Sequence, residues 1–179
     1  ARDFVHRDIS ANNFMMGLGE QASKLFLVDF GLAKRFNASP SWSTSKRRMM
    51  FKYVRPMVGT ARFCSIFCHQ GQEEARRDDM ESLGYLWLYL LQGKLPWQGV
   101  AAETSTEKLE AIYSIKLATS LQELCAGLPE EFLTYMTCVR GMGQYDVPNY
   151  DAIKALFRGL AAKEGIEYDY QYDWSPGRK

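Results

Sequence analysis

Two short polar motifs near the start of the chain constrain its fold and chemistry more than any other feature. The first is His6-Arg7-Asp8, which is followed five residues after the aspartate by Asn13. The second is Asp29-Phe30-Gly31, which ends the apolar run 25–28. Either motif alone is weak, but the pair in this order and spacing is specific. The pattern supplies two carboxylates and one amide, the oxygen-bearing groups that orient a nucleophile and bind Mg²⁺.

This pair of motifs resembles the signature of the protein kinases. Phosphoryl transfer requires a carboxylate that orients the attacking hydroxyl group, and oxygen ligands that hold Mg²⁺ against the phosphates of ATP. The resemblance implies that Asp8 is the catalytic base and that Asn13 and Asp29 bind Mg²⁺. It also implies that Met15 and Val28 form the floor of the adenine pocket, with a place in the core as the alternative for both.

The composition is that of a globular protein with a core of its own. The chain has 179 residues, of which 46% are hydrophobic, and its net charge is +1. A charge this small gives no reason to expect a nucleic-acid partner, and no apolar run is long enough to span a membrane. The four cysteines lack the spacing of a disulfide framework, so free thiols are expected, with Cys64, Cys68 and His69 as part of a metal site as the alternative.

The first third of the chain reads as short strands and loops. Residues 1–5 are expected to end a helix, and 14–16 and 25–28 are expected to be strands around a turn at 17–19. Residues 31–60 are long, polar and aperiodic, which indicates a functional loop. Its hydroxyl groups are weak candidates for phosphorylation: Ser39, Ser41, Ser43, Thr44 and Ser45.

The rest of the chain is predicted to be helical. Asp78 is expected to cap a strongly apolar helix that ends at Gly93, because the apolar residues repeat at helical spacing. Further helices are predicted over 107–117, from 129–131 onward, and over 151–161. The predicted fold class is therefore mainly α: a kinase C-terminal lobe in which a helical bundle accompanies a short β-hairpin that carries the magnesium ligands.

Several further motifs resemble the casein kinase 1 family more closely than kinases in general. They are the runs 59–62 (Gly-Thr-Ala-Arg), 76–85 (Arg-Arg-Asp-Asp-Met-Glu-Ser-Leu-Gly-Tyr), 95–99 (Leu-Pro-Trp-Gln-Gly) and 168–174, together with Ser65-Ile66-Phe67 in place of Ala-Pro-Glu. The similarity extends from about Phe4 to about Trp174. It implies a serine/threonine kinase with a catalytic loop at 4–13, an activation segment at 29–67 and a helical subdomain at 78–163.

Only five residues precede His6, and the glycine-rich loop and paired lysine of a complete kinase precede this motif. We therefore expect the chain to be the C-terminal lobe of a longer protein, inactive alone, with its own N-terminal lobe as a partner. Protein substrates are the other expected partners. The expected location is the cytoplasm, with the nucleus as a further compartment.

The casein kinase 1 resemblance also implies roles for polar residues around the catalytic loop. Asp79 is expected to accept hydrogen bonds from the backbone near His6 and Arg7, and His6 is expected to be a packing residue. The family prefers substrates that carry an acidic or phosphorylated residue, which basic side chains bind. The residues that match such anion sites are Arg62 and Lys108, and in a second cluster Arg7, Lys34 and Arg55. An ordinary solvated surface charge is the alternative for each of these five.

Three departures from the family favour a different function. Ser10 and Ala11 stand where the family has lysine and proline, and Phe67 replaces an asparagine. The missing lysine normally neutralises the γ-phosphate, so its absence costs transition-state stabilisation. Phe67 is expected to weaken the anchoring of the activation segment. A pseudokinase, which binds or scaffolds a partner and transfers phosphate poorly, is therefore the alternative to an active enzyme.

Overall fold

The computed structural model describes residues 3–36, 57–170 and 172. The chain divides into two compact units, Ala1–Ser10 with Phe30–Pro148 and Ala11–Asp29 with Asn149–Lys179. Helices dominate and the strands are short and paired, so the expected fold class is confirmed. No helix within the described ranges is long and apolar enough to cross a membrane. The predicted helical subdomain 78–163 is divided between the two units, because its last helix belongs to the second.

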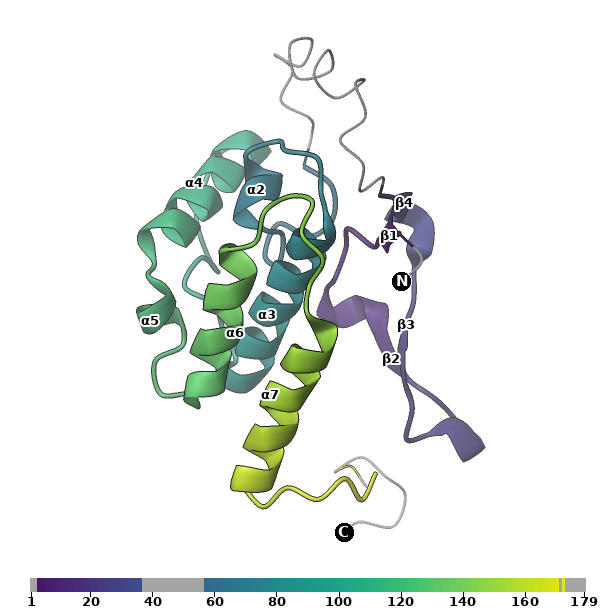
Figure 1. Cartoon of the computed structure of the whole chain (residues 1–179). Helices are drawn as coiled ribbons and strands as arrows, with labels where there is room; N and C mark the ends of the chain where they lie inside the picture. The colour runs from purple at the N-terminus through teal and green to yellow at the C-terminus, as the bar shows by residue number, and fades with distance from the viewer. Residues whose placement is uncertain (1–2, 37–56, 171, 173–179) are drawn as a thin grey trace. The chain divides into compact units, whose positions relative to one another are not determined.

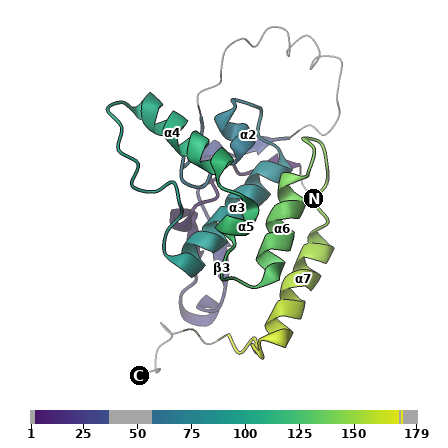
Figure 2. The same ribbon diagram turned by 90° about the vertical axis from the view of Figure 1, so that its left-hand side faces the viewer.

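The first unit is built around a long buried helix, α3 (Arg76–Gln92). Figures 1 and 2 show α6 beside α3, and α2 beside α4. The other α-helices among the described residues of this unit are α2 (Ile66–His69), α4 (Ser105–Ala118), α5 (Leu121–Leu124) and α6 (Glu130–Arg140).

The start of α3 differs from the prediction. The helix begins at Arg76, with Ala75 as its N-cap, so Asp78 lies inside the first turn. The Asp78 carboxylate reaches back and accepts a hydrogen bond from the Ala75 backbone N–H at 2.7 Å. Asp78 therefore satisfies one of the orphan donors of the helix start from within the helix. The end of α3 is confirmed, because Gly93 has φ 77° there, a left-handed conformation that glycine adopts without strain.

The core of the first unit lies between α3 and α6. Tyr85 and Leu88 of α3 are completely buried, and the Tyr85 ring lies edge-on to Trp97 with ring centroids 4.9 Å apart. Tyr135 of α6 donates a hydrogen bond from its hydroxyl group to the Met80 carbonyl oxygen at 2.8 Å. This bond fixes α6 along α3, since an unpaired buried hydroxyl group would be costly.

Residues 4–5 form a strand rather than the expected end of a helix. β1 (Phe4–Val5) pairs antiparallel with β4 (Lys34–Arg35), with Phe4 opposite Arg35 and Val5 opposite Lys34. Val5 packs with Phe36 and Ala75 in a small core cluster. The prediction was wrong because the partner strand lies far along the chain and leaves no local signal.

The second unit contains the predicted hairpin. β2 (Phe14–Met16) pairs antiparallel with β3 (Leu25–Leu27), and Met15 lies opposite Phe26. The connection includes the 3₁₀ turn η2 (Gly19–Gln21), and the 3₁₀ turn η1 (Ala11–Asn13) leads into β2. The unit also contains α7 (Tyr150–Lys163), which starts at an Asn149 cap one residue earlier than predicted.

The close approach of α6 to α3 at Gly84 gives a testable prediction. A Cβ atom at Gly84 would lie 2.2 Å from Met136 Sδ and 3.0 Å from the Tyr135 ring. We expect Gly84→Ala to lower the free energy of unfolding by about 1–3 kcal/mol, because the α3–α6 contact has no space for the methyl group. Denaturant unfolding measures this change.

The control is Gly159→Ala in α7, where a Cβ atom meets nothing within 4 Å. We expect this variant to gain about 0.5–1 kcal/mol, because alanine favours a helix over glycine. Equal effects of the two substitutions would contradict the packing argument.

Candidate active site

The catalytic-loop motif is hydrogen-bonded to the start of α3. Asp79 Oδ2 accepts a hydrogen bond from the His6 backbone N–H at 2.6 Å, and Asp79 Oδ1 accepts one from Arg7 at 2.8 Å. Arg7 has φ 71°, a left-handed conformation that is strained for a side-chain-bearing residue. Burial raises the pKa of the Asp79 carboxyl group, although the two backbone N–H groups act in the opposite direction. Both hydrogen bonds are those expected from the sequence.

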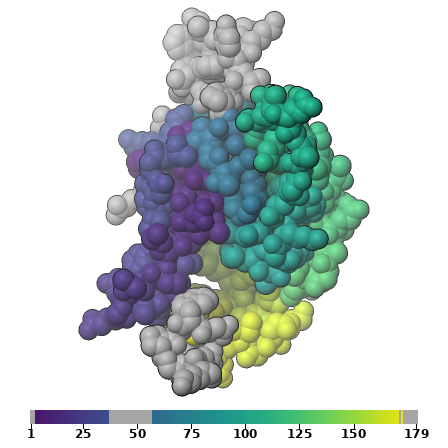
Figure 3. Space-filling model, turned by 180° about the vertical axis from the view of Figure 1, so that it is seen from behind, coloured from purple at the N-terminus to yellow at the C-terminus, as the bar shows by residue number. Residues whose placement is uncertain are grey.

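Asp8, the expected catalytic base, is oriented by residues near the C-terminal end of the expected activation segment. Asp8 Oδ1 accepts hydrogen bonds from the Thr60 backbone N–H at 3.0 Å and from the Thr60 hydroxyl group at 2.8 Å. Gly59 has φ 82°, and a Cβ atom there would lie 2.3 Å from the Arg7 carbonyl oxygen. Only glycine allows this close approach, so Gly59-Thr60 lies tightly against the catalytic loop. Figure 3 shows dark purple atoms from the N-terminal part of the chain beside blue atoms from about residue 60 onward.

His6 is a packing residue, as expected. Its side chain is buried, and its ring lies edge-on to Phe30 with ring centroids 5.1 Å apart. Its Nδ1 atom accepts a hydrogen bond from the Asp8 backbone N–H at 3.3 Å. The histidine of the first motif and the phenylalanine of the second are therefore in direct contact.

The expected magnesium ligands lie in the second unit, at the open end of the hairpin. The Val28 backbone N–H donates a hydrogen bond to the Asn13 carbonyl oxygen at 2.9 Å, just beyond the β2–β3 ladder. This bond places Asn13 beside Val28, the residue before Asp29. Asp29 is exposed and has φ 61°. An amide and a carboxylate at one end of a hairpin are hard oxygen donors, and this donor set fits Mg²⁺. Met15 on β2 is 57% exposed.

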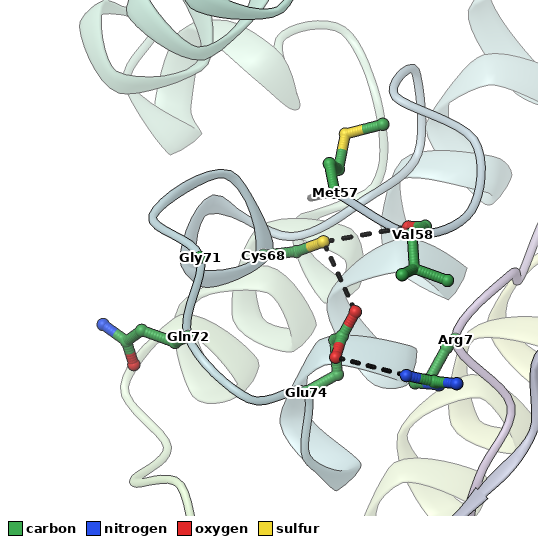
Figure 4. Close-up of a pocket in the computed structure, with 7 residues that line it drawn as sticks. All are labelled: Arg7, Met57, Val58, Cys68, Gly71, Gln72 and Glu74. Atoms are coloured by element: carbon green, nitrogen blue, oxygen red, sulfur yellow. Dashed lines mark hydrogen bonds and ion pairs between the residues drawn. The ribbon is translucent and has the colours of Figure 1, made fainter. Parts of the chain in front are cut away.

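The second basic cluster expected to bind anions is occupied by carboxylates of the chain itself. Figure 4 shows the Arg7 guanidinium next to Glu74, and the two charged groups are 3.9 Å apart. Arg7 Nε also donates to the Leu32 carbonyl oxygen at 2.6 Å, and Lys34 forms an ion pair with Glu73. Arg55 lies outside the described residues. Neither glutamate has a local sequence signal, because they lie about 40 residues or more from their partners in sequence.

The first expected anion site consists of Arg62 and Lys108, and both side chains are exposed. Arg62 is exposed, and its guanidinium carbon lies 5.2 Å from the centroid of the Tyr89 ring. A cation over an aromatic face is held in a preferred orientation. Lys108 is exposed on the first turn of α4. Both cations are therefore accessible to a ligand.

The end of the activation segment is anchored by contacts with α3. The guanidinium carbon of Arg77 lies 3.4 Å from the centroid of the Phe67 ring, so the aromatic residue stacks on α3. Ser65 donates a hydrogen bond from its hydroxyl group to the Asp78 carboxylate. Arg77 also donates to the Met142 carbonyl oxygen at 3.1 Å.

A fully buried lysine is the polar residue that the sequence analysis missed most clearly. Lys116 of α4 is 0% exposed, and its Nζ atom donates to the carbonyl oxygens of Ala61 at 2.9 Å and Cys64 at 2.6 Å. Burial lowers the pKa of its ammonium group. The available signal was its position four residues after Ile112, which places it on the buried face of the helix.

Comparison with known families matches residues 1–140 to the protein kinase domain. The chain belongs to the protein kinase domain family. The motifs around Asp8 and Asp29 therefore lie in a kinase domain, whose general chemistry is phosphoryl transfer from ATP. This match identifies the protein kinase domain and does not distinguish the casein kinase 1 family within it.

The Asp78 carboxyl group gives a prediction on the pH dependence of stability. Burial raises its pKa from 3.8 to about 6, against the lowering effects of Ser65 and the Ala75 N–H group. The folded chain therefore binds this proton more tightly than the unfolded chain. The free energy that this carboxyl group contributes to folding is fully present below pH 3.8, the ordinary pKa of an aspartate. It is lost as the pH rises through about 6, the pKa in the folded chain.

We expect the free energy of unfolding of the native chain, relative to Asp78→Asn, to fall by about 2 kcal/mol between pH 4 and pH 7, at about 1.4 kcal/mol per pKa unit. Urea unfolding at several pH values measures this difference. The control is Asp151→Asn, which changes an almost fully exposed side chain. Parallel stability curves for the native chain and Asp78→Asn would contradict the prediction.

Proposed function

We propose that this chain is the C-terminal lobe of a serine/threonine protein kinase of the casein kinase 1 type, which uses ATP and Mg²⁺. The observation that carries the proposal is the pair of hydrogen bonds from Thr60 to Asp8 Oδ1. They set the orientation of the one carboxylate that the catalytic loop offers to a substrate hydroxyl group. The motif Gly59-Thr60-Ala61-Arg62, which supplies them, is among those shared with the casein kinase 1 family.

In the proposed mechanism, Asp8 orients the attacking hydroxyl group of the protein substrate and accepts its proton. Asn13 and Asp29 would hold the magnesium ion. When bound, the ion neutralises the charge of the ATP phosphates. Met15 and Val28 would contact the adenine ring, and the exposure of Met15 supports this role.

The substrate preference is proposed to depend on Arg62 and Lys108. Both are exposed cations, Arg62 before α2 and Lys108 on the first turn of α4, and a phosphorylated or acidic residue of a substrate is the natural partner of such a cation. Arg7 and Lys34 contribute less to this preference, because Glu74 and Glu73 already neutralise them.

A pseudokinase is the second candidate function. Ser10 is 3% exposed and occupies the place of the γ-phosphate lysine of the family. A small buried hydroxyl group does not supply the missing positive charge. On this reading the domain binds a partner and transfers phosphate poorly.

The proposed activity predicts the effect of removing the base. We expect Asp8→Asn, made in the full-length protein, to lower the rate of phosphate incorporation by about 10²–10⁴-fold, because the amide cannot accept the proton. Radiolabelled ATP and a serine-containing acidic peptide measure the rate. Asp151→Asn, which changes an exposed residue of α7, is the control and should keep the native rate.

Equal incorporation by the native protein and Asp8→Asn would reject the enzyme. Nucleotide binding without measurable transfer by the native protein would instead favour the pseudokinase.

The proposed substrate preference predicts a selective effect of Arg62. We expect Arg62→Gln to lower kcat/KM for a phosphorylated peptide by about 10-fold or more, since a hydrogen bond to a charged group contributes about 1.5–3 kcal/mol. The value for the unphosphorylated peptide should change little. Lys94→Gln, which neutralises another exposed cation, is the control. A loss of the same size for both peptides would show that Arg62 does not read the phosphate.

A further inference from the structure

A buried lysine of α4 is hydrogen-bonded to the stretch of backbone that follows Gly59. Lys116 is fully buried, and its Nζ atom donates to the carbonyl oxygens of Ala61 at 2.9 Å and Cys64 at 2.6 Å. One ammonium group thus connects two carbonyl groups that are three residues apart in sequence. Because this group is fully buried, it does not reach a substrate or a nucleotide, and the proposed mechanism gives it no role.

The two acceptors belong to a tight backbone turn, residues 60–64, which we call the 60–64 turn. The Thr60 carbonyl oxygen accepts a hydrogen bond from the Cys64 backbone N–H at 3.0 Å, which closes the turn. The buried Trp97 side chain donates from Nε1 to the Arg62 carbonyl oxygen at 2.7 Å. Three carbonyl oxygens of this turn therefore receive hydrogen bonds from two buried side chains, those of the lysine and the tryptophan.

The 60–64 turn also orients the expected catalytic base. Its first residue, Thr60, donates from its backbone N–H at 3.0 Å and from its hydroxyl group at 2.8 Å to Asp8 Oδ1. Ala61, whose carbonyl oxygen accepts from Lys116, is the next residue, and the peptide unit that joins it to Thr60 is planar and rigid. A shift of the turn therefore moves both donors that orient the Asp8 carboxylate.

The surroundings of the ammonium group keep it in one place. Lys116 Nζ lies 5.1 Å from the ring centroid of Tyr85 and 5.1 Å from that of Trp97, and both rings are buried. Aromatic faces attract a cation, and they do so more strongly where water is excluded. Movement of the ammonium group would leave carbonyl oxygens without their donor inside the protein, which is costly. The lysine is therefore a rigid attachment point for the 60–64 turn.

We propose that Lys116 is a positioning residue for phosphoryl transfer, which fixes the 60–64 turn so that Thr60 holds the Asp8 carboxylate in its reactive orientation. This inference rests on the proposed kinase function. A lysine that only stabilised the fold would change the amount of folded protein and leave the rate of each folded molecule unchanged. A positioning lysine changes that rate, because a misplaced base stabilises the transition state less. The two roles therefore differ in a measurable quantity.

A double-mutant cycle in the full-length protein separates these roles. Lys116→Met removes the charge and the donors but keeps an unbranched side chain. We expect it to lower kcat for an unphosphorylated serine peptide, per folded molecule, by about 10-fold or more with little change in KM, since a misplacement of about 1 Å can cost ~10²-fold. In the Asp8→Asn background it should cause no further loss, because the base is already absent. Lys94→Met, which removes an exposed charge, is the control and should keep the native kcat.

Two outcomes of this cycle would overturn the proposal. One is an unchanged kcat in Lys116→Met, and the other is the same fractional loss of kcat in both backgrounds, which a purely structural role produces. If Lys116→Met does not fold, Lys116→Gln takes its place, because its amide keeps an N–H donor on a shorter side chain. We expect a smaller loss of kcat from this variant, again confined to the background that contains Asp8, and the same two outcomes would count against the proposal.

Amide hydrogen exchange at Thr60, measured by NMR, gives a readout that does not depend on activity. We expect the Thr60 N–H group to exchange about 10-fold faster or more in Lys116→Met than in the native protein, because its hydrogen bond to Asp8 is loosened. Gly84→Ala is the matched control, since it disturbs the contact of α3 with α6 and not the 60–64 turn. Exchange at Thr60 should be unchanged in this control. Unchanged exchange at Thr60 in Lys116→Met would overturn the proposal.

Failure of this inference is distinguishable from failure of the proposed function. If the native protein and Asp8→Asn incorporate phosphate equally, the kinase function fails, and any role of Lys116 in the reaction fails with it. If Asp8→Asn loses activity while Lys116→Met keeps the native kcat, the kinase function stands and only the positioning role of Lys116 is rejected.

Discussion

The two hydrogen bonds that Asp79 accepts from the catalytic loop are the constraint on which the first unit depends. The carboxylate is a buried negative charge, and burial alone raises its pKa. The backbone N–H groups of His6 and Arg7 stabilise it, and they are themselves orphan donors that a strained loop cannot pair internally. The buried carboxylate and the two backbone N–H groups therefore provide each other's hydrogen-bond partners. The left-handed conformation of Arg7 persists because α3 holds it in place.

The same helix holds the far end of the activation segment. Asp78 accepts from Ser65, Arg77 stacks on Phe67, and the Thr60 segment in turn orients Asp8. Three consecutive residues of α3 thus contact both stretches that flank the expected active site. The start of α3 is therefore the scaffold for both stretches.

Features with a local signal could be predicted from the sequence. The hairpin strands, the end of α3 at Gly93 and the start of α6 after Pro129 were all found, because period, glycine and proline act over a few residues. The apolar period predicts that α4 starts at 107, whereas the helix starts at Ser105, where the capping box of Thr104 and Glu107 sets its beginning. This capping box is a local signal that the sequence itself contains.

Features that depend on distant partners could not be predicted. β1 requires β4, and the glutamates that neutralise Arg7 and Lys34 belong to a segment about 40 residues or more away in sequence. Lys116 could be placed on the inner face of α4, but nothing local indicated that the carbonyl oxygens of Ala61 and Cys64 would receive its ammonium group. The same holds for Phe67, whose stacking partner Arg77 lies in another helix.

The most direct test of this account is residue-resolved amide hydrogen exchange at His6 and Arg7, measured by NMR in the native protein and in Asp79→Asn. The account predicts slow exchange of both amides in the native protein. In Asp79→Asn, one acceptor oxygen is lost, so at least one of the two amides should exchange about 10-fold faster or more, in line with about 1.5–3 kcal/mol for a hydrogen bond to a charged group. Amides in the middle of α6 should be unchanged. Equal exchange rates at His6 and Arg7 in the two proteins would contradict the claim that Asp79 holds the catalytic loop.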